Sequence, residues 1–242
     1  MQSNLTCLDK KRIRPYILIK DGVLTKYLLS DEENGIVRIP DGVEVIAKNV
    51  FGWNDLPEGQ VLKSETERKQ NVREIYIPAS VKKIEGGAFL NTRRVKKIEI
   101  SPDSPAGVVI DGVLFNKDKT VLIYCMDAHP DKSDIDEKEE HIYYVPEGVR
   151  TIDIGAFRCC YLDKVVLPDT IESIKDDAFA YSGVRKINIP HSVTEFGENV
   201  FKGCYFKGAE AITVDNNCKV LAVNSLGLFR ESGEKLLDFE QD

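Results

Sequence analysis

VPEGV at residues 145–149, LPDTI at 167–171 and IPHSV at 189–193 are three copies of one short pattern. The prolines of successive copies are 22 residues apart. In each copy a branched apolar residue follows the proline at the third position, another apolar residue follows at the sixth, and a phenylalanine follows at the eleventh. A fixed period of this length is typical of a solenoid, in which each repeat buries its apolar residues only by stacking on its neighbours.

The same pattern occurs twice nearer the N-terminus, once at Pro40 and once at Pro78. A further copy begins at residues 98–100 and then continues into a different kind of element. Each copy opens with alternating residues such as Ile75-Tyr76-Ile77, which predict a strand whose outer residues face the core and whose middle residue faces solvent. Because proline cannot donate to a strand ladder, the proline that follows ends the pairing and turns the chain.

A short polar or thiol side chain stands three residues after each phenylalanine of the pattern. Such side chains hydrogen-bond locally, so we expect them to satisfy backbone groups inside the bend of each turn. Two of the six cysteines occupy this position, none of the six forms a CxxC pair, and we interpret them as mostly reduced and structural. The residues at this position are Asn54, Thr92, Cys160, Ser182 and Cys204.

A second repeating unit is marked by Asp-Gly between two apolar, β-rich runs, at Asp21-Gly22 and at Asp111-Gly112. This dipeptide in this context predicts a β-hairpin. A looser copy lies around Gly227, and a polar turn and a further apolar pair follow the second and third copies. We expect these hairpin modules to occupy the space of whole turns without breaking the stack.

We expect a single domain over residues 1–242, with an N-terminal hairpin or cap at 1–34 and a C-terminal one at 206–242. Repeats fill residues 35–100 and 142–205, and the hairpin module with an acidic loop fills 101–141. Two polar stretches interrupt the period, at 56–71 and at 127–140, and both are predicted to be solvated loops.

The net charge of −7 and the isoelectric point near 5.2 argue against nucleic acid or an anionic membrane as the partner. No run of apolar residues is long enough for a membrane span, so no membrane insertion is expected. The first ten residues contain no apolar leader, and we expect no secretory signal in the chain as given.

No pattern of residues points to catalysis. The three histidines, His129, His141 and His191, are far apart, and none has a cysteine or another histidine at metal-ligand spacing. The sequence contains no GxSxG, Walker, GxGxxG or HExxH motif. We therefore expect no enzyme, no catalytic residues, no metal and no cofactor.

The combined pattern IxIPxxVxxIxxxAFxxCxxL resembles the BspA-type leucine-rich repeats of bacteria, and the resemblance runs from about Tyr16 to Leu237. It implies a leucine-rich repeat solenoid: a right-handed superhelix, rich in β-structure, with short helical or irregular turns and here with interleaved β-hairpin modules. Members of the family are commonly surface or secreted proteins associated with adhesion and protein binding. The resemblance therefore implies a protein partner and an exported product, whereas the missing leader leaves a cytoplasmic location open.

The exposed face of the strands is the candidate binding site, because packing does not account for its residues. Two tyrosines in the middle positions suit an interface, since tyrosine combines apolar area with a polar tip. The alternative is that tyrosine simply favours strands. Flanking lysines either keep the sheet soluble or face an acidic partner. The middle positions are Arg38, Tyr76, Glu99, Tyr144, Val166 and Asn188, and the flanking lysines are Lys97, Lys164 and Lys186.

Two functional hypotheses follow from the sequence. In the first, the chain is a non-enzymatic scaffold that binds another protein, or mediates adhesion, through this strand face. In the second, it is a structural spacer or module of a longer bacterial surface protein and has no ligand of its own.

Overall fold

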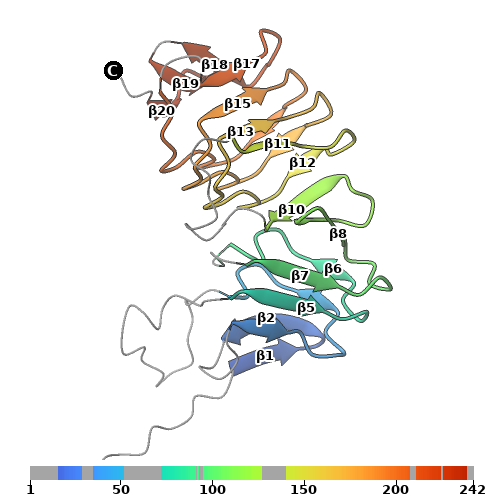
Figure 1. The fold of residues 1–242 in the computed structure, drawn as a ribbon. Helices are drawn as coiled ribbons and strands as arrows, with labels where there is room; N and C mark the ends of the chain where they lie inside the picture. The colour runs from blue at the N-terminus through green and yellow to red at the C-terminus, as the bar shows by residue number, and fades with distance from the viewer. Residues whose placement is uncertain are drawn as a thin grey trace, which may run out of the picture.

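The computed structural model describes residues 16–28, 35–51, 72–90, 92, 95–126, 140–207, 211–224 and 226–238. These residues wind into an elongated stack of turns built from strands and tight turns, and they contain no helix (Figure 1). The loop expected at 56–71, and all but Glu140 of the loop expected at 127–140, lie outside the described residues.

The strand predicted before each proline is present and forms the first side of each turn. Within a sheet these strands are parallel, and equivalent positions of the repeat lie side by side, as Tyr143, Val165 and Ile187 do. One sheet contains β3 (Ile36–Arg38), β5 (Glu74–Ile77) and β7 (Lys97–Ile100), and a second contains β11 (Ile142–Tyr144), β13 (Lys164–Val166), β15 (Lys186–Ile189) and β17 (Ile212–Val214).

A second side of each turn is a two-residue strand that contains the apolar residue six positions after the proline. These strands are also parallel, as the pairs Ile152–Ile174 and Ile174–Phe196 illustrate. They are β4 (Val45–Ile46), β6 (Lys83–Ile84), β12 (Thr151–Ile152), β14 (Ser173–Ile174) and β16 (Glu195–Phe196).

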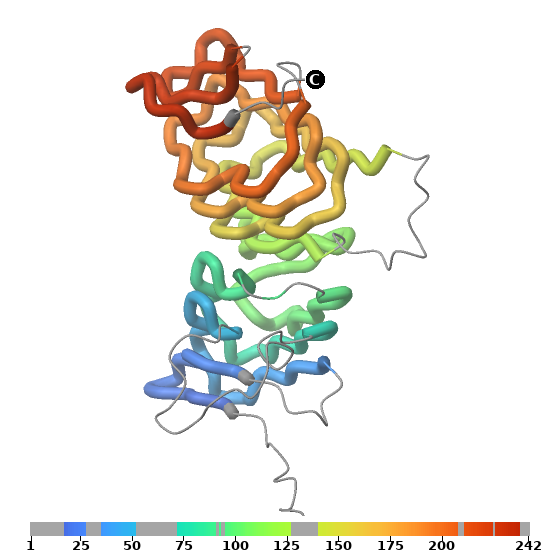
Figure 2. Tube along the Cα trace, turned by 90° about the vertical axis from the view of Figure 1, so that its left-hand side faces the viewer, coloured from blue at the N-terminus to red at the C-terminus, as the bar shows by residue number. Residues whose placement is uncertain are grey.

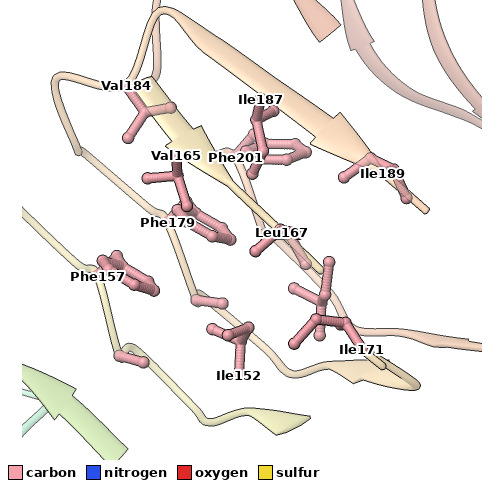
Figure 3. Close-up of a cluster of buried hydrophobic side chains, with 14 of the residues drawn as sticks. Ile152, Phe157, Val165, Leu167, Ile171, Phe179, Val184, Ile187, Ile189 and Phe201 are labelled. Atoms are coloured by element: carbon pink, nitrogen blue, oxygen red, sulfur yellow. The ribbon is translucent and has the colours of Figure 1, made fainter. Parts of the chain in front are cut away.

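The third side is the bend that contains the phenylalanine, and neighbouring turns are hydrogen-bonded there as well. The backbone N–H of Phe157 donates to the carbonyl of Ala178 over 2.7 Å, and that of Phe179 donates to Val200 over 2.9 Å. The rings of Phe157, Phe179 and Phe201 point into the centre of the stack and lie over one another in successive turns (Figure 3). The centroids of Phe157 and Phe179 are 5.0 Å apart, with the two rings nearly parallel. The pattern that defined the repeat is therefore its core.

The short side chains that follow the phenylalanines form the predicted local hydrogen bonds at Thr92 and Cys204. Thr92 donates its hydroxyl to the carbonyl of Phe89 over 2.7 Å, and Cys204 donates its thiol to the carbonyl of Phe179 over 3.0 Å. The Cys204 sulfur also lies 3.4 Å from the hydroxyl of Ser182, which has the same position in the preceding turn. The cysteines of the described residues are free thiols and, apart from the half-buried Cys159, are buried.

The three expected hairpins are also present. Asp21 and Gly22 connect β1 (Tyr16–Lys20) to β2 (Val23–Leu28), and Asp111 and Gly112 connect β8 (Val108–Ile110) to β9 (Val113–Phe115). All four of these turn residues have positive φ, as the tight hairpin turn of this dipeptide requires. β9 continues into β10 (Val121–Cys125), and the C-terminal module consists of β18 (Leu221–Asn224), β19 (Gly227–Arg230) and β20 (Lys235–Asp238).

One expectation about these modules is wrong, because the central one interrupts the stack. The first-side strands divide into two sheets, one ending at β7 and the other beginning at β11, and the buried side chains divide into two clusters. The strands β9 and β10 lie between the N-terminal and C-terminal turns (Figure 2). Val113 and Phe115 pack into the C-terminal cluster, whereas Leu114 between them packs into the N-terminal one. These two strands therefore separate the two clusters, and each of their faces packs into a different one.

Candidate functional site

The candidate residues of the strand face fall on two different sheets. Because the first-side strands are interrupted between β7 and β11, these residues form two groups rather than one row. We call Arg38, Tyr76, Lys97 and Glu99, on β3, β5 and β7, the N-terminal patch. We call Tyr144, Lys164, Val166, Lys186 and Asn188, on β11, β13 and β15, the C-terminal patch.

Tyr76 is the centre of the N-terminal patch. The strand register places Arg38, Tyr76 and Glu99 side by side across the three strands. The guanidinium carbon of Arg38 lies 4.3 Å from the centre of the Tyr76 ring, and the ammonium nitrogen of Lys97 lies 5.1 Å from it. Because β5 lies between β3 and β7, the two cations come from the strands on either side of Tyr76. Both contacts have the geometry of a cation–π interaction.

Carboxylates complete this arrangement. The Tyr76 hydroxyl donates to Glu74 Oε2 over 2.7 Å, and Lys97 Nζ lies 2.8 Å from Glu99 Oε2. Hydrogen bonding to Glu99 and, secondly, to Tyr76 raises the pKa of the Lys97 ammonium above its ordinary value. The lysine is therefore held in its charged form, and the tyrosine ring is oriented by partners on both neighbouring strands.

A shallow groove of about 360 Å³ adjoins Tyr76 at the end of the strands where the prolines turn the chain. Its volume lies at the lower end of the range for small-molecule sites, and most of its surface is apolar. Its lining residues are Arg38, Ile39, Tyr76, Ile77, Pro78, Glu99, Ser101 and Pro102.

The C-terminal patch is less organised for binding. Asn188 is committed to the fold, because its side-chain amide donates to the carbonyl of Leu167 and accepts from the Leu167 N–H, each over 2.8 Å. Val166 is half-buried, whereas Tyr144 exposes 66% of its surface. Tyr144 is therefore the side chain of this group that is most available to a partner.

The lysines of the C-terminal patch lie directly opposite one another, since Lys164 and Lys186 are paired across β13 and β15. Lys186 lies 3.8 Å from Glu140, and both of these side chains are well exposed. An exposed ion pair of this kind contributes little to stability, so the lysines of this patch are free to respond to an incoming charge.

A group of exposed tyrosines on the phenylalanine side of the stack was not among the candidates. Tyr161, Tyr181 and Tyr205 follow the phenylalanines of three successive turns by two or four residues, and Tyr205 exposes 72% of its surface. Arg158 lies 4.7 Å from the Tyr181 ring, which packs against the backbone of Gly203. In the sequence, the signal for these tyrosines was their spacing from the phenylalanine. That spacing indicates exposed tyrosines only once the bend is known to face solvent.

The described residues contain no cluster of three or more histidine, cysteine or acidic side chains that could hold a metal ion. In the same part of the chain, no helix is long and apolar enough to cross a membrane.

Comparisons with known proteins identify the family of the repeat and its fold. The family model described as "BspA type Leucine rich repeat region" matches residues 60–106 and 140–226 in six copies. No curated protein matches the sequence.

Among solved structures, a leucine-rich repeat protein from Eubacterium ventriosum is 21% identical, with a TM-score of 0.54 over 76% of this chain and 46% of that chain. A leucine-rich cell surface protein from Faecalibacterium prausnitzii is also 21% identical, with a TM-score of 0.45 over 90% of this chain and 57% of that one. The chain thus spans about half the length of these solved structures, and the first likeness shows a shared fold.

Proposed function

The chain belongs to the BspA-type leucine-rich repeat family, and on that basis we propose that it is a non-enzymatic scaffold that binds an extended segment of another protein through the N-terminal patch. Leucine-rich repeat solenoids are scaffolds whose long surfaces commonly serve protein interactions. The observation that carries the proposal is the position of Tyr76, held between Arg38 and Lys97 at the edge of the groove.

Preorganisation favours the N-terminal patch over the C-terminal one. Binding costs the conformational freedom of side chains that become ordered, and a side chain already fixed by its neighbours loses less. Tyr76 is fixed by two cations and by its hydrogen bond to Glu74, whereas no such contacts are seen for Tyr144 among the described residues. A tyrosine with an arginine beside it is also a common centre of interface energy.

The chemistry of the patch indicates what the partner offers. The groove accepts an apolar side chain, because Ile39, Ile77 and the prolines line it. Among the described residues Arg38 has no carboxylate partner, and stacking on Tyr76 leaves its N–H groups available. Guanidinium groups bind carboxylates in a two-pronged manner. The partner segment therefore combines an apolar residue with a nearby acidic one.

Selection from a random linear-peptide phage library against the immobilised full-length protein tests the proposal. We expect enrichment of peptides that pair apolar and acidic residues. Binding of the enriched peptides should fall at least about tenfold in Tyr76→Ala, which corresponds to about 1.4 kcal/mol. Tyr205→Ala is the matched control, because it removes an exposed tyrosine from another side of the stack.

Two outcomes would count against the binding role. Enriched peptides that bind Tyr76→Ala as tightly as the unaltered protein would place the site elsewhere. A selection that enriches no peptide would favour the second candidate, a spacer within a longer surface protein. That candidate is supported by the coverage of the Eubacterium ventriosum structure, since the chain matches 46% of that protein's length.

A further inference from the structure

The outermost strand at the N-terminal end of the stack has one edge that no other strand of the described residues covers. β1 is the terminal strand of the sheet β1-β2-β4-β6, and its only strand partner among the described residues is β2. With five residues it is also the longest terminal strand in the sheets of the described chain. Leu18 and Ile19 in its centre expose 46% and 40% of their surfaces.

The central hairpin shows what covers the corresponding edge elsewhere in the same molecule. β2 and β10 have the same place in the stack, because each pairs in parallel with the two-residue strand of the next turn: Leu24 with Ile46, and Leu122 with Ile152. On their other side both pair with an antiparallel strand, β1 and β9 respectively. A further antiparallel strand, β8, covers the far edge of β9.

By this correspondence, β1 has no partner among the described strands in the place that β8 occupies beside β9. Such an edge carries N–H and C=O groups directed outward, and natural proteins usually protect it with prolines, charges or a covering element. β1 contains no proline, and Lys20 at its end is its single charged residue. By contrast, the exposed Leu226 at the other end of the molecule lies in a hairpin turn and not on a terminal strand.

We propose that the β1 edge pairs with β1 of a second copy of this chain, in antiparallel orientation about a two-fold axis. Antiparallel pairing of a strand with itself is self-complementary, as a symmetric dimer requires. Pairing centred on Leu18 places Lys20 opposite Tyr16 of the second copy and keeps the two lysines apart. Leu18 then lies beside Leu18 of the second copy and Ile19 beside Ile17, which covers part of their exposed surface, and the two four-stranded sheets become one.

Sedimentation velocity of the full-length protein over a concentration series tests this pairing. We expect a reversible monomer–dimer equilibrium. The double substitution Leu18→Lys/Ile19→Lys should raise the dissociation constant of the dimer more than tenfold, since charges on an edge strand oppose pairing. Leu226→Lys is the matched control and should leave the dissociation constant unchanged, because it alters a leucine at the far end of the stack that is at least as exposed as Leu18.

A second measurement separates loss of pairing from loss of folding. Both substituted side chains are exposed, so the melting temperature of the variant should stay within a few degrees of the original. In addition, Leu18→Cys should give a covalent dimer on mild oxidation, since facing residues of antiparallel strands are close enough for a disulfide.

Either of two results would overturn the proposal. One is a full-length protein that remains monomeric throughout the series; slow hydrogen exchange of the β1 amides in that monomer would assign the edge to another part of the same chain. The other is a dimer that the double substitution does not weaken.

Discussion

At the scale of single residues, each turn depends on one backbone conformation that the apolar pattern does not reveal. The residue two positions before each core phenylalanine has a positive φ, between 54° and 76°. This conformation is costly for residues with a Cβ, and glycine, asparagine and aspartate tolerate it best. The chain uses only these three types there: Asn49, Gly87, Gly155, Asp177 and Asn199.

Asn199 is the best position to test this requirement, because its side chain is exposed. Asn199→Ala should lower the free energy of unfolding by about 1–2 kcal/mol, since alanine has no local hydrogen bond to offset the left-handed conformation. Asn199→Gly should stay within about 0.5 kcal/mol of the original, because glycine adopts this conformation freely. Urea denaturation of the three proteins measures both values, and equal stability of the alanine and glycine variants would contradict the argument.

At the scale of elements, the Asp-Gly hairpins show how one local signal acquires different roles. After Asp21-Gly22 the next strand, β2, joins the stack directly. After Asp111-Gly112 the next strand, β9, pairs only with β8 and β10, and it is β10 that joins the stack. The Asp-Gly dipeptide determines the hairpin turn. Which strand of the module continues the solenoid depends on which one pairs with the two-residue strand of the next turn.

Leu114 on β9 should couple the two halves of the molecule, because it is the residue of this strand that packs into the N-terminal cluster. Leu114→Ala should lower stability by about 2–5 kcal/mol, as for other buried leucines. It should also separate the two halves, so that hydrogen exchange becomes fast in residues 16–126 before it does in 140–238.

Leu228→Ala provides the comparison for this variant. Leu228 is equally buried but belongs only to the C-terminal cluster. Its loss should speed exchange near the C-terminal hairpin and leave the N-terminal half protected. Uniformly faster exchange along the whole chain in Leu114→Ala would show that β9 does not act as the link.

At the scale of the whole molecule, the two halves also meet directly at the bend of their facing turns. Oδ1 of Asp153, in the C-terminal half, lies so close to Gly86 that a Cβ at Gly86 would come within 2.6 Å of it. Burial raises the pKa of this carboxyl above its ordinary value, although the hydrogen bond from Ile154 and the charges of Lys175 and Lys48 oppose the shift. An ionised carboxylate at this junction therefore opposes folding.

This junction should make stability depend on pH in a defined direction. Because the pKa of Asp153 is raised on folding, the folded state binds a proton more tightly, and stability falls as pH rises from the ordinary aspartate value through the raised one. Asp153→Asn should remove that dependence and raise stability at neutral pH relative to acidic pH. Asp169→Asn, at an exposed turn, is the control. Identical pH profiles for Asp153→Asn and the original protein in urea denaturation would refute the prediction.

The sequence by itself determined the repeat, its strands and its core. The same four positions recur in every turn, and their spacing alone identifies the strand, its end and the ring in the centre. In one turn they are Pro168, Ile171, Ile174 and Phe179. The hairpin turns were equally predictable, because Asp-Gly between two strands strongly favours the tight turn that a hairpin needs.

Only the tertiary structure decided where the stack divides and which exposed residues act together. β9 and β10 are apolar on both faces, and nothing local says that each face belongs to a different cluster. Likewise Tyr76 and Asn188 occupy the same repeat position, yet one is held between two cations beside a groove and the other is bonded to the backbone of its neighbour. Repeat position fixes the direction of a side chain, whereas its contacts depend on the residues that adjacent turns place beside it.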